Sequence, residues 1–278
     1  MSQLVEIENL HVAFRNDDGE LKDAVRGVSF SLGREKLGIV GESGSGKSLT
    51  GRSLLGVLPP YARMSADKLT FDGIDLRTAT PRVRRSLRGG RMGMILQDPK
   101  FSLNPVMRVG AQIVEAIRIG DRKISGSDAR RKALQTLEQV HIREPARVAR
   151  LYPHELSGGM GQRVMIAMMV VREPDLLIAD EPTSALDVSV RNQVLSILDE
   201  LVTRRGMGLV FISHDLNLVS KFCDRVIVMY SGRIVETIEA ARLHEATHPY
   251  TRGLLSCLPR IDGPLDPLPT LQREASWA

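Results

Sequence analysis

The sequence predicts an α/β fold: a mostly parallel sheet, an N-terminal antiparallel β subdomain and an inserted α-helical subdomain. Residues alternate between apolar and polar in LVEIENLHVAF and VRGVSFSL, and the turn-forming NDDGE separates these segments. This pattern is typical of neighbouring antiparallel strands. Continuous apolar runs appear in KLGIVG, RMGMILQ, DLLIAD, GLVFIS and RVIVMYSG. Such runs indicate parallel strands that are buried on both faces.

The helical insertion is expected at about residues 104–171. AQIVEAIRI and SDARRKALQTLEQV carry apolar residues at intervals of three and four, and no strand pattern interrupts them. We expect one domain over residues 1–260 that contains this insertion. Residues 261–278 are rich in proline and predict a short C-terminal tail that is extended or disordered.

Composition excludes several classes of protein. Of the 278 residues, 42% are hydrophobic and 26% charged, as in ordinary globular proteins. Aromatic residues make up only 4%, which argues against binding nucleic acid by base stacking. No apolar run approaches the roughly 20 residues that span a bilayer, and the N-terminus does not resemble a signal peptide. We therefore expect a cytoplasmic chain whose two cysteines, Cys223 and Cys257, are reduced thiols.

A basic segment, PRVRRSLRGGRM, holds much of the positive charge of a chain whose net charge is +5. It could meet lipid headgroups or a nucleic acid. A solvated helix face is the favoured interpretation, because no aromatic residues interleave with the arginines.

The motif Gly41-Glu42-Ser43-Gly44-Ser45-Gly46-Lys47-Ser48 follows an apolar strand and opens a helix. This pattern and context predict a phosphate-binding P-loop. Glycines let the backbone wrap around phosphate oxygens, and the helix N-terminus supplies N–H donors. Lys47 is expected to reach the β- and γ-phosphates and Ser48 to bind Mg²⁺.

Polar residues end three other predicted strands. Asp180 ends LLIAD and is a candidate Mg²⁺ ligand, and Glu181 follows it as candidate general base. Gln97 and His214 end MILQ and GLVFIS. Taken alone, each of these residues could equally be a loop residue or a structural residue without a catalytic role. Because parallel strands deliver their carboxyl ends to one edge, we expect these side chains to act together.

A second candidate anion site lies at Leu156-Ser157-Gly158-Gly159-Met160, where a serine and two glycines open a helix. One chain has no evident need for two such sites. Two chains packed head to tail would use both, because each would close the nucleotide of the other.

With these motifs in this order, the sequence resembles the ABC ATPases over nearly its whole length. Residues 41–48 resemble the Walker A loop, Gln97 the Q-loop, LSGGM the signature and LLIADE the Walker B segment. Ser184-Ala185-Leu186-Asp187 resembles the D-loop, His214 the switch histidine and Phe14 the aromatic that stacks on adenine. The resemblance implies an ATP-sandwich dimer with Glu181, His214 and Gln97 as catalytic residues and Ser48, Gln97 and Asp180 around Mg²⁺. The implied ATP contacts are Phe14, Gly41, Ser43, Gly44, Ser45, Gly46, Lys47, Ser48, Leu49, Ser157, Gly158, Gly159 and Asp187.

Three further segments, QDPKFSLNPV, YPHELSGGM and HPYTRGLLSCLPR, resemble the peptide and nickel importer branch of the family. The branch implies a second ATPase chain, identical or related, two integral membrane permease subunits and an extracytoplasmic solute-binding protein, with no nucleic acid. The chain would then lie at the cytoplasmic face of the inner membrane. The cargo would be di- or oligopeptides, with nickel chelates, opines or other small solutes as alternatives.

The chain departs from the branch at two points. Gly161 occupies a position that is usually basic, and no cysteine-rich tail is present, so we expect no iron-sulfur cluster. Two other classes remain as alternatives: a soluble ABC ATPase acting on ribosomes or DNA, and a nucleotide-binding module that does not hydrolyse. Against the ribosome or DNA class, the chain has neither a second ATPase unit nor a long coiled coil. Against the module that does not hydrolyse, the residues Lys47, Asp180, Glu181 and His214 are all intact.

Overall fold

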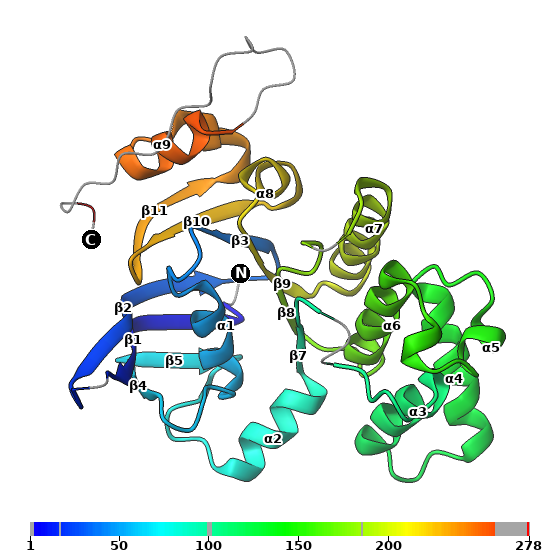
Figure 1. Cartoon of the computed structure of the whole chain (residues 1–278). Helices are drawn as coiled ribbons and strands as arrows, with labels where there is room; N and C mark the ends of the chain where they lie inside the picture. Colours follow the sequence, from blue (N-terminus) through cyan, green and yellow to red (C-terminus); the bar gives the residue numbers. More distant parts are fainter. Residues whose placement is uncertain (1–2, 17, 99–101, 185, 259–276, 278) are drawn as a thin grey trace. The chain divides into compact units, whose positions relative to one another are not determined.

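The computed structural model describes residues 3–16, 18–98, 102–184, 186–258 and 277. The chain forms two compact units. Unit 1 consists of residues 1–79 and 210–278, and unit 2 consists of residues 80–209 (Figure 1). The proline-rich tail expected at 261–278 lies outside the described residues, except for Trp277.

Unit 1 contains the antiparallel sheet, in the order β2-β1-β5-β6 with β4 also paired to β1. Its strands are β1 (Val5–Arg15), β2 (Leu21–Leu32), β4 (Arg63–Ser65), β5 (Lys68–Phe71) and β6 (Ile74–Asp75). Val5 lies opposite Leu32 on one side and Phe71 on the other, and all three side chains are fully buried. The alternating pattern in the sequence therefore puts its apolar face in the core.

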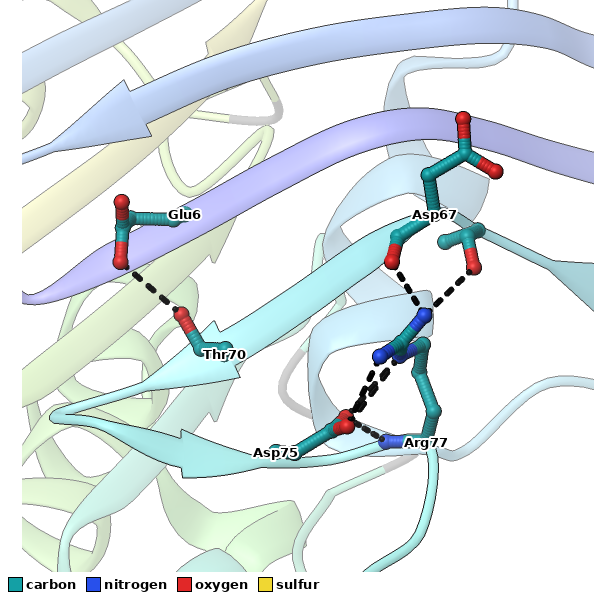
Figure 2. A network of polar contacts seen from close by, with 6 residues as sticks. Glu6, Asp67, Thr70, Asp75 and Arg77 are labelled. Atoms are coloured by element: carbon teal, nitrogen blue, oxygen red, sulfur yellow. Dashed lines mark hydrogen bonds and ion pairs between the residues drawn. The ribbon is translucent and has the colours of Figure 1, made fainter.

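A polar network closes the short β5–β6 hairpin of this sheet, as Figure 2 shows. The Arg77 guanidinium donates to both Asp75 carboxylate oxygens, at 3.1 and 2.9 Å, and also to the Asp67 carbonyl. These hydrogen bonds hold the pKa of the Asp75 carboxyl below its usual value. The Thr70 hydroxyl of β5 donates to Glu6 of the neighbouring strand β1 at 3.4 Å.

Unit 1 also holds parallel strands. β3 (Lys36–Val40) pairs in parallel with β10 (Arg225–Tyr230), and β10 pairs antiparallel with β11 (Arg233–Glu239). The buried β3 and β10 are the apolar runs of the sequence. β11 is not predicted by the sequence pattern, because its residues RIVETIE include two glutamates and are only half buried.

Four helical elements of unit 1 follow its strands: α1 (Lys47–Leu55), α8 (Leu216–Phe222), η3 (Ala240–Glu245) and α9 (Pro249–Ser256). A Cβ at Gly38 of β3 would lie 2.3 Å from Val219 of α8, so this glycine permits the close packing of helix on strand. Cys223 follows α8 and is a free thiol, as is Cys257. Burial raises the pKa of the Cys223 thiol to about 12.

In unit 2, β7 (Met92–Ile95) pairs in parallel with β8 (Leu176–Asp180). The chain passes from unit 2 to unit 1 within β9 (Gly208–Ser213). Two helices flank these strands in the sequence, α2 (Pro81–Gly90) and α7 (Val188–Arg205). The arginine-rich α2 buries only Leu87, so its basic residues lie mainly on the surface.

The described residues between β7 and β8 form α3 (Val109–Gly120), α4 (Gly126–Gln139), α5 (Pro145–Val148), η2 (Pro153–Glu155) and α6 (Gly158–Val170), shown in Figure 1. Their apolar positions, such as Ile113, Leu137 and Val164, are fully buried. Across the described parts of the chain, no helix combines the length and the apolar character needed to cross a bilayer.

Candidate active site

The loop between β3 and α1 needs glycine for steric reasons at two positions. Gly41 has φ of 149°, and a Cβ there would lie 2.1 Å from the Met229 carbonyl oxygen. Gly46 has φ of 96°, and its Cβ would lie 2.8 Å from the Ala24 carbonyl oxygen. Both positions exclude any side chain, so the close approach of β10 and β2 fixes the course of this loop.

The tip of the loop has open space beside it. Gly44 has φ of 81°, and a Cβ there would meet nothing within 4 Å. Gly46 is the N-cap of α1 and supplies no side-chain acceptor to the first turn. N–H groups at an uncapped helix N-terminus, with room in front of them, are suited to bind an anion. The loop therefore fits a phosphate group.

Lys47 is held inside this loop and is only 6% exposed. Its Nζ donates to the carbonyl oxygens of Gly41 and Glu42, each at 2.8 Å, and approaches the Ser45 hydroxyl at 3.4 Å. The ammonium group thus lies against the carbonyl dipoles of the loop. Ser48 and Leu49 follow it in the first turn of α1 and are half buried.

Two other expected site residues belong to unit 1. Phe14 is near the end of β1 and half buried, with its ring centroid 5.8 Å from that of Tyr61. Tyr61 is 70% exposed. Nothing in the local sequence pattern around Tyr61 indicates that it lies beside Phe14. His214 is exposed and follows directly after β9.

The two carboxylates expected in the site, Asp180 and Glu181, are in unit 2. Asp180 is the last residue of the fully buried β8 and is itself 6% exposed. Glu181 follows with φ of 49°, in the left-handed region that costs free energy for any residue but glycine. The Ser184 N–H and hydroxyl donate to the Glu181 carbonyl, at 3.4 and 3.2 Å, and so hold this turn. Such local strain is typical of functional sites.

Gln97 comes two residues after β7 and is exposed. Ile95 of β7 pairs with Ala179 of β8 in a parallel register. The two strands therefore end at the same edge of the sheet. Asp180 is the last residue of β8 there, and Gln97 lies two residues beyond the end of β7.

The signature segment forms the N-terminus of α6. The Ser157 side chain caps this helix by accepting from the Met160 N–H at 3.4 Å. A Cβ at Gly159 would lie 2.4 Å from Val190 in the first turn of α7, whose N-cap is Asp187. The N-termini of α6 and α7 therefore pack against each other. A Cβ at Gly158 would meet nothing within 4 Å.

The two signature glycines are expected to respond differently to alanine. Gly159→Ala should lower the melting temperature by about 3–8 °C, because its Cβ collides with Val190. Gly158→Ala should leave the melting temperature unchanged or raise it slightly, because the added methyl group has space and alanine favours helix. Differential scanning fluorimetry measures both, and Val190→Ala should restore part of the loss in Gly159→Ala. Equal losses in the two single variants would contradict this packing argument.

The expected site residues thus divide between the two units, and each unit is described by itself. Unit 1 holds the P-loop, Phe14 and His214. Unit 2 holds Gln97, the signature segment, the two carboxylates and Asp187.

The family of the chain follows from comparison with known proteins. A family model described as ABC transporter matches residues 25–184. A putative peptide import ATP-binding protein of Brucella abortus is 46% identical, over 96% of this chain and 81% of that protein. The chain therefore belongs to the ABC transporter family and is an ATPase of that family, which confirms the resemblance of its motifs.

The names of the relatives describe a narrower role than the name of the family does. The dipeptide transport ATP-binding protein DppD of Escherichia coli (strain K12) is 46% identical, over 93% of this chain and 79% of that protein. DppD of Bacillus subtilis (strain 168) is 43% identical, over 94% of this chain and 78% of that protein.

Solved structures confirm the expected fold class. MJ0796, described as a bacterial ABC transporter cassette in a dimeric structure, has a TM-score of 0.75 and 26% identity over 85% of this chain and 98% of that chain. A second structure of MJ0796 is a post-hydrolysis state bound to ADP and Pi.

Proposed function

We propose that this chain is the ATP-hydrolysing subunit of a membrane importer for di- or oligopeptides. The observation that carries this proposal is its 43–46% identity, over more than nine-tenths of its length, to proteins named for dipeptide transport or peptide import. Nickel chelates, opines and other small solutes are alternative cargoes. The chain would act at the cytoplasmic face of the inner membrane, bound to its membrane subunits.

Nucleotide binding would use the residues of unit 1. The open tip at Gly44 and the uncapped start of α1 would receive the phosphates, with Lys47 as the positive charge and Phe14 beside the adenine. Mg²⁺ would be held by Ser48, Gln97 and Asp180 and would neutralise charge on the phosphates. Hydroxyl, amide and carboxylate oxygens are the donors that this ion prefers.

Hydrolysis would use Glu181 as general base toward the attacking water, with His214 contacting the γ-phosphate. A second ATPase chain, a copy or a related protein, would close over the ATP with its signature segment. The open space at Gly158 supports this role, because no atom of the described residues lies within 4 Å of the place where a Cβ would be. ATP would favour the closed dimer, and hydrolysis would remove its contacts. For this reason Gly158→Ala should weaken ATP-dependent dimerisation without lowering the melting temperature.

The membrane subunits would dock on the helical segment of unit 2. A groove of about 950 Å³ lies among α3, α4 and α5. Its lining includes the apolar residues Ala111, Val114, Ala133 and Leu134 and five arginines, Arg108, Arg118, Arg122, Arg130 and Arg150. Among the described residues only Glu115 brings a negative charge to this lining.

A groove lined by both apolar residues and arginines suits an amphipathic helix that carries acidic residues. We propose that a cytoplasmic segment of each permease subunit has this character and occupies the groove. Movement of the helical segment would then be transmitted to the membrane subunit.

Charge reversal tests this docking site. Arg130→Glu should reduce copurification of the permeases at least tenfold, while ATP binding stays within about twofold of the original chain. Arg131→Glu is the matched control, because Arg131 is the next residue of α4, does not line the groove and pairs with Asp128 at 2.5 Å. Equal retention of permeases by both variants would rule out this groove.

The function as a whole is tested by isolating the complex from membranes. Tagged Glu181→Gln chain would be purified from detergent-solubilised membranes with Mg-ATP, and its partners identified by mass spectrometry. We expect two multispanning proteins and a second ATPase, and loss of labelled dipeptide uptake when the gene is deleted. Ribosomal proteins or nucleic acid without membrane proteins would overturn the proposal. If dipeptide uptake stayed intact and uptake of another solute were lost, the proposed cargo would be wrong, and the role as ATPase subunit of an importer would stand.

A further inference from the structure

The C-terminal helix α9 is anchored to the sheet of unit 1. Its N-terminus is held by Glu236 of β11, whose Oε1 accepts from the Thr247 N–H at 2.7 Å and from the His248 N–H at 3.3 Å. The His248 side chain is the N-cap and accepts from the Tyr250 N–H at 3.2 Å. These three hydrogen bonds fix the start of α9 next to β11.

Tyr250 is the most deeply enclosed aromatic residue of this region, with 0% exposure. Its ring centroid lies 4.5 Å from that of Tyr230 at the end of β10 and 6.0 Å from that of Trp277. Aromatic packing of this kind leaves the ring little freedom, so the position of its hydroxyl is well determined.

The hydroxyl of Tyr250 reaches the P-loop. It accepts a hydrogen bond from the backbone N–H of Glu42 at 3.1 Å. The carbonyl of the same residue, Glu42, accepts from Lys47 Nζ at 2.8 Å. Tyr250 thus lies two hydrogen bonds away from the ammonium group that is expected to meet the phosphates.

A second contact from outside the P-loop acts on its other side. The Gly232 N–H, in the turn between β10 and β11, donates to the Ser45 carbonyl at 3.2 Å. A Cβ at Gly41 would collide with the Met229 carbonyl, which leaves this end of the loop no room to move toward β10. From α9, the Tyr250 side chain contributes to the contacts around the P-loop through its hydrogen bond with Glu42.

We propose that Tyr250 is a positioning residue for nucleotide binding: its hydroxyl fixes the Gly41–Glu42 end of the P-loop and so the place of Lys47. The inference rests on the proposed role of the P-loop in binding ATP. It gives α9, which lies about 200 residues further along the chain, a direct part in the affinity for ATP.

Tyr250→Phe removes only the hydroxyl and keeps the ring. The dissociation constant for Mg-ATP, measured on the full-length chain with a fluorescent ATP analogue, should rise about three- to tenfold. The KM for ATP should rise by the same factor, while kcat at saturating ATP stays within about twofold, because a bound nucleotide restores the loop. The melting temperature without nucleotide should fall by no more than about 4 °C.

Tyr230→Phe is the matched control, because the Tyr230 ring belongs to the same cluster and its hydroxyl has no hydrogen bond among the described residues. It should leave the affinity for ATP unchanged. An unchanged affinity in Tyr250→Phe, with or without a fall in melting temperature, would show that the hydroxyl only stabilises α9 and would overturn the inference.

Lys47→Ala separates this inference from the proposed function. If Lys47→Ala loses ATP binding and Tyr250→Phe does not, the P-loop assignment stands and the role of Tyr250 is wrong. If Lys47→Ala binds ATP normally, the P-loop assignment itself fails.

Discussion

Glu181→Gln is expected to lower the rate of ATP hydrolysis about a thousandfold, the range of a lost general base. Glutamine keeps the shape of the side chain but cannot accept a proton from water. The affinity for ATP should stay within about twofold, because the phosphate contacts of the P-loop are untouched. Phosphate release under steady-state conditions measures the rate, and retention of labelled ATP measures the binding.

Glu173→Gln is the matched control for this substitution. Glu173 also has a left-handed backbone, with φ of 55°, and precedes β8, whereas Glu181 follows it. The Glu173 side chain is exposed, and the Glu173→Gln chain should hydrolyse ATP at the original rate. A Glu181→Gln chain that turned over ATP normally would show that another group activates the water.

Lys47→Ala is expected to weaken binding of Mg-ATP about a hundredfold, because charge-assisted hydrogen bonds to the phosphates are lost. The side chain is 6% exposed, so its removal also leaves the carbonyls of Gly41 and Glu42 without their donor. Equilibrium binding of a fluorescent ATP analogue measures the loss.

The control for this prediction is Lys221→Ala, in the last turn of α8. This exposed residue should affect neither ATP binding nor the melting temperature. Should Lys47→Ala bind ATP with unchanged affinity, the loop would not be the phosphate site.

Much of the fold was predictable from local pattern. The buried strands β3, β8 and β10 are continuous apolar runs, and the alternation in β1 and β2 indicates a sheet with one buried face. The strand β11 could not be predicted in this way, because its half-exposed residues carry no such pattern. Its place is set by pairing with β10, which is a tertiary interaction.

The candidate site was predictable where chemistry requires a fixed spacing. The glycines at 41 and 46 and the charge at Lys47 must follow one another in the chain, so the motif reveals them. The contacts of Tyr250 with Glu42 and of Tyr61 with Phe14 join residues 208 and 47 positions apart by residue number. No local pattern encodes such pairs, because side-chain packing alone brings them together.

The turn that links β10 and β11 has a practical consequence for labelling this protein. Hairpin tips are usually the safest places to insert a fluorophore or an affinity tag. Here Gly232 donates to the Ser45 carbonyl, and a side chain at that position would meet the Ala24 carbonyl at 2.7 Å. An insertion at this tip would therefore disturb the loop that surrounds Lys47. Gly19, between β1 and β2, has no atom within 4 Å of its would-be Cβ. A label at Gly19 is therefore expected to leave the contacts around Lys47 intact.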